Sequence, residues 1–561
     1  MVLAADTLRL DANWVDYILI ALYFVFVLGI GILARRSVSS SIDFFLSGRA
    51  LPAWVTGLAF ISANLGAVEI MGMSANGAQF GIPTVHYFWV GAVPAMLFLG
   101  VVMMPFYYGS KVRSVPEFMQ KRFGTGAHLV NALSFALAQL LIAGINLYLL
   151  ATIVNTLLGW NLYLSLVVAA LIVLSYITLG GLSAAIYNEV LQFFIIVAAL
   201  LPLTLVGLNR VGGYSGLEDK INDAAQLNSW PGTNLTGITS PFWSVVGIVF
   251  GLGFVLSFGY WTTNFVEVQR AMASQSMSAA RRAPIIGSFP KMFIPFLVIF
   301  PGMIAAVLTS EVAKAKQSGD PSFDYNDSLL YLIRDLLPNG MLGIAIAGLL
   351  ASFMAGMAAN ISAFNTVLSY DLWQDYIVKD REDGYYLRVG RIATVAATVI
   401  AIGTALIASN YTNIMNYLQT LFGFFNAPLF ATFILGMFWK RMTPTAGWVG
   451  LVSGTLAAVV VGVLSEDALG GMSVGAIGLK GQGASFVAAG AAFVVDILVS
   501  VVVSQATRPK PDGELRGLVY SLTPKEDFHD RSEGQLAWWQ RPTRLAAVSG
   551  VLVIALNIIF W

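Results

Sequence analysis

The sequence predicts an all-α membrane protein with about 14 transmembrane helices. Three observations support this fold class: 57% of the 561 residues are hydrophobic, only 11% are charged, and long apolar runs recur along the chain. A soluble domain carries roughly 25% charged residues. The composition therefore argues against a soluble enzyme and a nucleic-acid binder. With no cysteine and three histidines, it also argues against a disulfide scaffold or a metal cluster.

Each transmembrane helix is expected where about 20 consecutive residues are apolar, because a helix satisfies its own backbone hydrogen bonds in lipid. The run at 14–34 is too long for a signal peptide and follows an acidic start, so it counts as the first span. Numbered from span 0 to span 13, the expected spans are 14–34, 53–75, 84–107, 128–157, 161–179, 184–208, 241–262, 284–309, 338–370, 389–408, 413–437, 444–465, 484–504 and 544–560.

Lysine and arginine predict the orientation of the chain, because both resist translocation across a membrane. Of the 31 Lys and Arg residues, 23 fall in one set of alternate loops and seven in the opposite set, while Lys291 lies within a span. The richer set of loops is expected to be cytoplasmic. The chain is therefore predicted to be a multi-pass protein of the inner (plasma) membrane with both termini outside.

Two spans contain small polar residues that a lipid-facing helix does not need. Span 1 carries Ser62, Asn64 and Gly66 near its middle, and span 6 carries Gly and Ser residues ahead of Tyr260 and Trp261. Such segments are expected to interrupt the helix and to free backbone carbonyls that can bind a cation. The alternative is close helix packing through small residues. Two interrupted spans, five apart, are typical of transporters built from two inverted halves.

Four ionisable residues lie well inside expected spans: Glu69, Glu189, Lys291 and Asp496. Each costs ~2.5–3.5 kcal/mol at a helix centre, so each is expected to face the protein interior and to have a partner. Glu69 and Lys291 are the natural candidates for one site. For Glu189 a cavity role and interfacial snorkelling both stay open. For Asp496 a structural role is favoured, because it lies outside both expected repeats.

Motifs follow one another in order along the chain from Asp43 to about Lys440. They are Asp43-Phe-Phe-Leu-Ser-Gly-Arg-Ala-Leu-Pro52, the Ser-Val-Pro-Glu-Phe118 run before Lys121-Arg-Phe-Gly124, Tyr176-Ile-Thr-Leu-Gly-Gly-Leu-Ser183 and Phe433-Ile-Leu-Gly-Met-Phe-Trp-Lys440. In these motifs the chain resembles the sodium:solute symporter family, which contains bacterial sodium/galactose and mammalian sodium/glucose cotransporters. The resemblance implies a LeuT-type core of 5+5 helices in two inverted repeats, with one extra helix before and three after.

That core divides the chain into five regions. The resemblance implies an N-terminal segment with the first helix at 1–52, a first inverted repeat at 53–208, an external loop at 209–240, a second inverted repeat at 241–437, and three C-terminal helices with a cytoplasmic loop at 438–561.

The resemblance also implies a solute pocket between spans 1, 2, 6, 7 and 10. Its residues are expected to be Asn64, Glu69, Met73, Tyr87, Phe88, Ser257, Trp261, Lys291 and Gln419, with Tyr260 as the inner gate. Two positions depart from the galactose type, which has an amide where Glu69 stands and a carboxylate where Phe88 stands. A relocated acid changes which hydroxyl or amine groups can be paired, so galactose or glucose specificity does not follow from the resemblance.

A sodium site is implied where span 1 meets span 8. In the family it joins backbone carbonyls of span 1 to a carbonyl and two hydroxyl groups of span 8. The corresponding residues are Ser62 and Leu65 on span 1, and Ser352, Ala355 and Gly356 on span 8. Ala355 and Gly356 lack the hydroxyl oxygens, so sodium affinity is expected to fall unless Ser352 Oγ, water or another group substitutes. Glu189 matches an acidic position near the exit route of the ion.

The sequence thus predicts a secondary active symporter that imports a small polar organic solute, with a sugar or sugar-like molecule as the first guess. Sodium is the expected coupling ion, and alternating access the expected mechanism. Two alternatives stay open: proton coupling through Glu189 or Glu69, and a receptor that binds solute without transport. The expected partners are the solute, sodium and the lipid bilayer, with no nucleic acid and no obligate protein partner. An enzyme is not expected, because no nucleophile-base pair or nucleotide-binding loop is found.

Overall fold

The structure, a computed structural model, describes residues 8–35, 41–221, 223–230, 233–320, 322–466, 473–528 and 530–561. Within these ranges the regular structure is helical, apart from an isolated bridge between Leu51 and Ser274. In the expected N-terminal segment, residues 1–7 and 36–40 lie outside the described residues. The side chains at 176 and 178–181, within one of the family motifs, lie outside them as well.

Twelve helices of the described chain are long and apolar enough to cross a membrane, and one bent helix pair makes a thirteenth candidate. The continuous ones are α1 (Trp14–Arg35), α8 (Thr125–Leu158), α9 (Leu162–Val211), α20 (Asp383–Ala408), α21 (Ile414–Phe438), α22 (Pro444–Leu464), α23 (Gly481–Ala506) and α24 (Pro542–Ile559). The composite ones are η3 to α6 (Ile82–Gly109), α12 to α13 (Pro241–Thr263), α15 (Met277–Lys291) with α16 (Ile294–Leu308), and α19 (Met341–Thr366) with η9 (Val367–Ile377). The bent pair is α3 (Ala53–Asn64) with η2 (Val68–Gly72) and α4 (Met73–Phe80).

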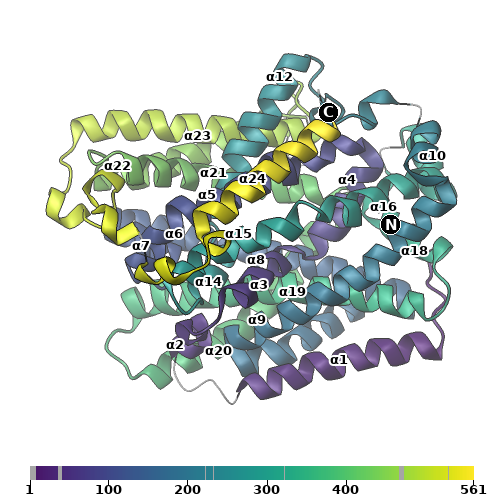
Figure 1. The fold of residues 1–561 in the computed structure, drawn as a ribbon, viewed down its shortest axis with the longest axis horizontal. Helices are drawn as coiled ribbons and strands as arrows, with labels where there is room; N and C mark the ends of the chain where they lie inside the picture. The colour runs from purple at the N-terminus through teal and green to yellow at the C-terminus, as the bar shows by residue number, and fades with distance from the viewer. Residues whose placement is uncertain are drawn as a thin grey trace.

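Shorter helices connect these spans. They are α2 (Ser41–Leu46), α7 (Val115–Phe123), α10 (Gly213–Lys220), α11 (Thr233–Thr236), α14 (Phe265–Met272), α17 (Ser310–Ser318) and α18 (Ser328–Leu336). In Figure 1, α1 runs along the bottom of the molecule, α23 along the top, and the yellow α24 crosses the front.

The expected spans near 161–179 and 184–208 are not separate helices. Both lie in α9, whose described apolar stretches are the shorter helix Leu162–Ser175 and the spanning helix Leu182–Val211. The Gly180-Gly181 pair, which lies between the two expected spans, does not end the helical backbone. Glycine weakens a helix by only about 1 kcal/mol, and α9 packs against α19 and α3, so packing outweighs propensity here.

Burial separates the core of the bundle from its periphery. In the most apolar stretch of α19 with η9, 89% of the residues are buried inside the protein, against 28% for α1 and 22% for α24. Helix α19 therefore lies at the centre of the bundle, and α1 and α24 present most of their apolar surface to the outside, as lipid-facing helices do.

The predicted interruption of span 1 is present. Helix α3 ends at Asn64, and the chain bends by 60° before the next helix begins at Val68. Gly66 makes this bend possible, because a Cβ atom there would lie 2.8 Å from Asn146 Oδ1 of α8 and 3.2 Å from Gly356 Cα of α19. The same Asn146 oxygen accepts a hydrogen bond from Ala67 N at 3.1 Å, which stabilises the unwound turn.

The predicted interruption of span 6 is wrong as to its place. The Gly-rich stretch is a continuous π-helical segment, η7 (Gly247–Ser257), and the chain leaves helical geometry only at Asn264. Close packing explains the glycines: a Cβ at Gly251 would lie 2.7 Å from Phe486 O, and one at Gly253 would lie 2.8 Å from Val90 Cγ1. In span 6 the small residues therefore allow close helix packing, which was the alternative to a helix break.

Candidate functional site

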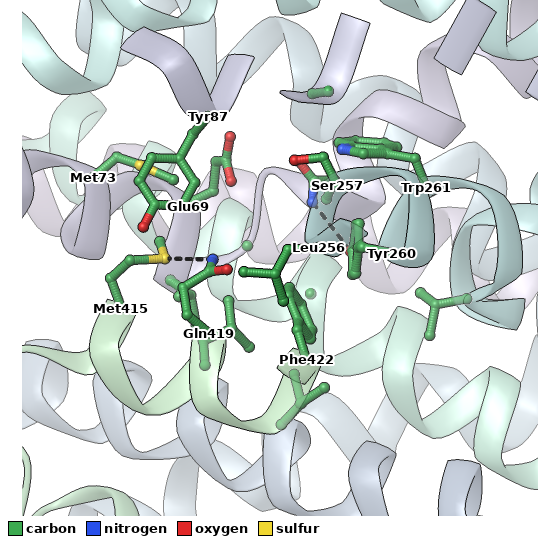
Figure 2. Close-up of a pocket in the computed structure, with 18 of the residues that line it drawn as sticks. Glu69, Met73, Tyr87, Leu256, Ser257, Tyr260, Trp261, Met415, Gln419 and Phe422 are labelled. Carbon is green, nitrogen blue, oxygen red and sulfur yellow. Dashed lines mark hydrogen bonds between the residues drawn. The ribbon is translucent and has the colours of Figure 1, made fainter. Parts of the chain in front are cut away.

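A cavity lies beside the bend after α3. It is bordered by α3 and η2, by η4 (Tyr87–Ala92), by η7 and α13 (Phe258–Thr263), by the end of α15, and by α8, α19 and α21. Figure 2 shows Met73, Tyr87 and Glu69 on one side, with Ser257, Trp261 and Tyr260 facing them across the space. Of the predicted solute-binding residues, those that line the cavity are Asn64, Glu69, Met73, Tyr87, Ser257, Tyr260, Trp261, Lys291 and Gln419.

Lys291 connects two sides of this cavity. It is the last residue of α15, where Pro295 at the start of α16 has no N–H to donate to the preceding turn, so the helix is broken at this point. Its ammonium group donates hydrogen bonds to Glu69 Oε1 and to Asn64 Oδ1. The pairing of Glu69 with Lys291 is thus observed as predicted from the sequence. Removing one partner of a buried ion pair costs about 3–5 kcal/mol, so the two side chains depend on each other.

Phe88 lies behind this ion pair and outside the cavity lining. Its ring centroid is 4.6 Å from Lys291 Nζ, and the ring of Trp261 is 5.2 Å from the same atom. The two aromatic faces stabilise the ammonium group by cation–π contacts. Phe88 therefore contacts the lysine, and it is the predicted solute-binding residue that the lining does not include.

Tyr260 connects the cavity to the helix that follows. Its hydroxyl accepts a hydrogen bond from Asn64 Nδ2 at 3.1 Å and donates one to Glu267 Oε1 at 2.6 Å. Its ring lies 4.6 Å from the ring of Phe422. The side chain is only half-buried, so it borders the space and also closes it toward α14.

The opposite wall is held by amides. Tyr87 donates its hydroxyl proton to Gln482 Oε1 of α23, and Gln482 Nε2 donates to Asn416 Oδ1 of α21. Gln419 Nε2 lies 3.3 Å from Met415 Sδ, a weak acceptor that a solute oxygen could replace (Figure 2). Gln419 is therefore the amide of this wall that is available to a solute.

The comparison with known proteins identifies the family. The sequence matches the family described as "Sodium:solute symporter family" over residues 44–454. The chain belongs to the sodium:solute symporter family. It is a multi-pass membrane transporter, not an enzyme, and it couples solute movement to sodium.

Three curated relatives show how far the sequence likeness extends. The symporter is 29% identical over 461 residues to the sodium/glucose cotransporter of Vibrio parahaemolyticus, which covers 79% of this chain and 84% of that protein. It is 30% identical over 534 residues to sodium/glucose cotransporter 4 of Mus musculus, covering 90% and 77%. It is 27% identical over 471 residues to sodium/myo-inositol cotransporter 2 of Rattus norvegicus, covering 79% and 69%.

Two solved structures share the fold. A Na+-coupled sialic acid symporter in a substrate-bound, outward-open state has a TM-score of 0.72 at 18% identity, covering 89% of this chain and 99% of that one. A nucleobase-cation-symport-1 family transporter in a closed conformation has a TM-score of 0.50 at 14% identity, covering 84% and 96%. The symporter has the LeuT fold that the sequence predicted.

The predicted sodium-binding residues fall into two separate places. Ser352 Oγ donates a hydrogen bond to Leu65 O, and Gly356 packs against Gly66, so α19 meets the unwound turn of span 1. Ser62 Oγ is buried and has no hydrogen-bond partner among the described residues. Ala355 is buried in α19 and, like Gly356, offers no side-chain oxygen. Ser352 and Asn146 therefore supply side-chain oxygens at this contact, and Asn146 was not predicted.

Glu189 lies elsewhere, on α9, and pairs with Arg270 of α14. Arg270 Nη2 is 2.6 Å from Glu189 Oε1, and Arg270 Nε is 3.3 Å from Oε2. Both side chains are completely buried, so interfacial snorkelling of Glu189 is wrong. For Asp496 the sequence favoured a structural role, and its carboxylate accepts hydrogen bonds from Thr432 of α21 and Ser500 of α23.

Several lining residues were missed in the sequence. Asn146 and Asn360 are polar residues inside apolar runs, which is the same signal that identified Asn64, and they could have been found by it. The others are apolar residues without a distinguishing pattern: Ala63, Val68, Ala92, Ile142, Leu252, Leu256, Val266, Met415, Leu418 and Phe422.

Proposed function

We propose that this symporter imports a small, uncharged, polyhydroxylated solute, a sugar or an inositol, together with sodium. The single observation that carries the proposal is the Glu69–Lys291 ion pair at the edge of the cavity. Because Glu69 neutralises the lysine, the pair offers a solute both a hydrogen-bond donor and a hydrogen-bond acceptor without a net charge. Charge balance thus favours a neutral solute over an anionic one.

The shape of the wall supports a solute with hydroxyl groups. Asn64 and Gln419 present amides to the space, and Trp261 and Tyr87 present aromatic surfaces of the kind that stack on sugar rings. The relatives named above are glucose and myo-inositol cotransporters, which agrees with this solute class.

The proposed cycle uses the bend in span 1. Sodium binds where α19 meets the carbonyls of Ser62 and Leu65, with Ser352 as a further ligand, and this contact favours the outward-open arrangement. The solute then binds between the inverted repeats 53–208 and 241–437, which rock against each other. Tyr260 acts as the inner gate. The chain lies in the plasma membrane with both termini outside.

Uptake into proteoliposomes tests this function. Radiolabelled D-glucose, D-galactose and myo-inositol are offered with an inward sodium gradient, with potassium in its place, and with the sodium gradient collapsed. Saturable uptake of at least one of the three that requires the sodium gradient is expected. If none enters, while amino acids or carboxylates raise the thermal stability of the protein in sodium, the proposed solute class is wrong.

A further inference from the structure

Glu267 is a buried carboxyl group that neither of the two ion pairs includes. It lies in the first turn of α14, and its side chain is completely buried. Nearby, Glu69 is paired with Lys291 and Glu189 with Arg270. Each of these pairs is neutral, so an ionised Glu267 would add one uncompensated negative charge to the protein interior, which is costly.

The two oxygens of Glu267 have different surroundings. Oε1 accepts the hydrogen bond from the Tyr260 hydroxyl at 2.6 Å. Oε2 is buried and has no hydrogen-bond partner among the residues that the structure describes. A carboxylate oxygen that is removed from water without a donor destabilises the charged form of the group, and protonation of the carboxyl removes the charge.

Tyr260 connects this carboxyl to the solute cavity through a hydrogen bond. The tyrosine lines the cavity, its hydroxyl donates to Glu267, and the same hydroxyl accepts from Asn64, which Lys291 contacts in turn. Side chains linked in this way join Glu69 at the cavity to Glu267 beneath it. A tyrosine hydroxyl can give its proton to one neighbour while it takes another from water, so Tyr260 is a suitable relay.

We propose that Glu267 is a proton-binding site of the transport cycle, loaded through Tyr260 from water in the cavity and emptied on the cytoplasmic side when Tyr260 withdraws. In loading, Tyr260 passes its hydroxyl proton to Glu267 Oε1, and the tyrosine oxygen takes a proton from a hydronium ion in the cavity, which becomes water. In release, the O–H bond of Glu267 breaks, the electron pair stays on the carboxylate, and the proton goes to water. This inference rests on the proposed function, to which it adds a proton that moves with solute and sodium.

The charges that face Glu267 permit both protonation states near neutral pH. Burial raises the pKa of Glu267 to about 7, while the Tyr260 hydroxyl and the positive charges of Arg270 and Lys291 act in the opposite direction. Glu189, on α9, raises the pKa of Glu267 further. The carboxyl therefore binds a proton below about pH 7 and loses it above.

Proton and solute movement can be measured together. Proteoliposomes with a trapped pH-sensitive dye receive a sodium gradient and whichever of D-glucose, D-galactose or myo-inositol is taken up. The wild type should acidify the lumen in proportion to solute uptake, and Glu267→Gln, which keeps an acceptor for Tyr260, should lower the ratio of protons to solute to background. Asp496→Asn, a buried carboxyl outside this chain of contacts, should leave that ratio unchanged.

The outcomes separate this inference from the proposed function. Sodium-driven uptake without acidification in the wild type, or an unchanged proton ratio in Glu267→Gln, overturns the inference and leaves the proposed function intact. If none of the three solutes enters, protonation of Glu267 can still be measured. Infrared difference spectra of the protein in lipid between about pH 5 and about pH 9 serve this purpose. A carboxylic acid band that titrates in the wild type and is missing in Glu267→Gln supports the site. A band that responds to sodium and not to pH makes Glu267 a sodium ligand and overturns it.

Discussion

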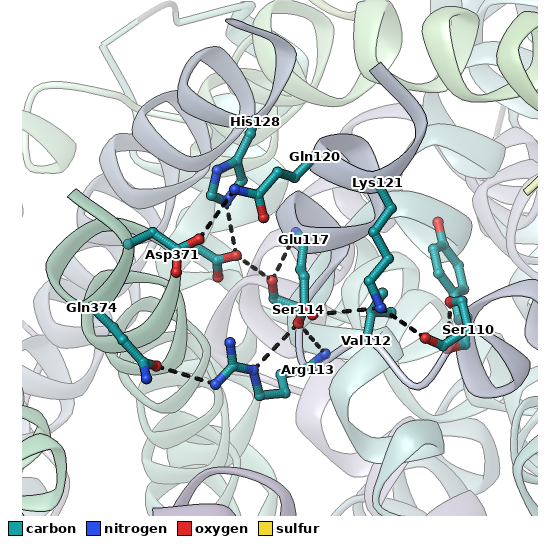
Figure 3. Close-up of polar contacts among 12 residues, drawn as sticks. Ser110, Val112, Arg113, Ser114, Glu117, Gln120, Lys121, His128, Asp371 and Gln374 are labelled. Carbon is teal, nitrogen blue, oxygen red and sulfur yellow. Dashed lines mark hydrogen bonds and ion pairs between the residues drawn. The ribbon is translucent and has the colours of Figure 1, made fainter. Parts of the chain in front are cut away.

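Glu69 and Asp371 are buried carboxylates with a cationic or basic partner, but only Glu69 borders the cavity. Glu69 pairs with Lys291 at the wall of the cavity. Asp371 of η9 is surrounded by protein: its Oδ1 accepts hydrogen bonds from Ser114 at 2.7 Å and lies 3.0 Å from His128 Nε2 (Figure 3). We call Ser114, His128 and Asp371 the α7–α8–η9 cluster. A buried acid by itself therefore does not mark a binding site; the adjacent space does.

The α7–α8–η9 cluster is extended by further bonds between the same elements. Arg113 donates to Gln374 Oε1 at 3.1 Å (Figure 3). Gln120 donates to Asp375 Oδ2 at 3.3 Å. His128 Nδ1 lies 2.6 Å from the Tyr376 hydroxyl. These contacts fix η9 against α7 and α8, so the cluster stabilises the fold at one end of the central helix. The cluster contains the residue types of a hydrolase triad. The arrangement differs, because Ser114 and His128 both contact Asp371 Oδ1 and the serine is not bonded to the histidine.

The largest effect is expected at the cavity pair. Lys291→Ala and Glu69→Gln should each reduce solute uptake to background while membrane insertion is retained, because each leaves a buried partner unpaired and removes a group that faces the solute. Uptake per inserted molecule in proteoliposomes measures the effect. Lys440→Ala is the control, since Lys440 pairs with Asp512 on the surface, where both side chains are more than half exposed. Normal uptake in both cavity variants would remove the pair from the binding site.

A smaller effect of a different kind is expected in the α7–α8–η9 cluster. Asp371→Ala leaves the Ser114 hydroxyl and the His128 ring without their acceptor, which should lower the free energy of unfolding by about 2–4 kcal/mol. The thermal unfolding midpoint in detergent should fall by several degrees. Uptake per folded molecule should change by no more than about twofold, because the cluster does not touch the cavity. If Asp371→Ala loses uptake without losing stability, Asp371 serves transport as Glu69 does, and the proposed difference between the two carboxylates is wrong.

The smallest effect is expected where α19 meets the bend of span 1. A Cβ at Gly356 would lie 2.7 Å from Asn146 Oδ1 and 3.0 Å from Gly66 Cα, so Gly356→Ala should push the unwound turn away from α19. We expect the sodium concentration for half-maximal uptake to rise by about threefold to tenfold, because part of the roughly 1–3 kcal/mol that such overpacking costs falls on sodium binding. Gly403→Ala on α20, where no atom lies within 4 Å of an added Cβ, is the matched control. If both variants show the same sodium dependence, this contact does not take part in sodium binding.

The candidate site was partly readable from the sequence because charge inside lipid is costly. Glu69 and Lys291 stood out as ions in apolar runs, and their pairing followed from the need for a partner. Glu267 gave no such signal, because it lies in a polar connection between spans and becomes buried only when α14 folds back against α3 and α15. Arg270 lies in the same polar connection, yet it is buried against Glu189, 81 positions away.

The sequence by itself determined the helical class, the positions of most of the apolar spans and the polar interruption at Asn64, because lipid permits few backbone structures and tolerates few polar groups. Only the tertiary structure decided that Asn146 and Gly356 fill the bend of span 1, that the glycines of span 6 serve packing instead of a break, and that Glu267 lies beneath Tyr260. These features depend on the distance between segments far apart in the chain. Local periodicity and composition carry no information about that distance.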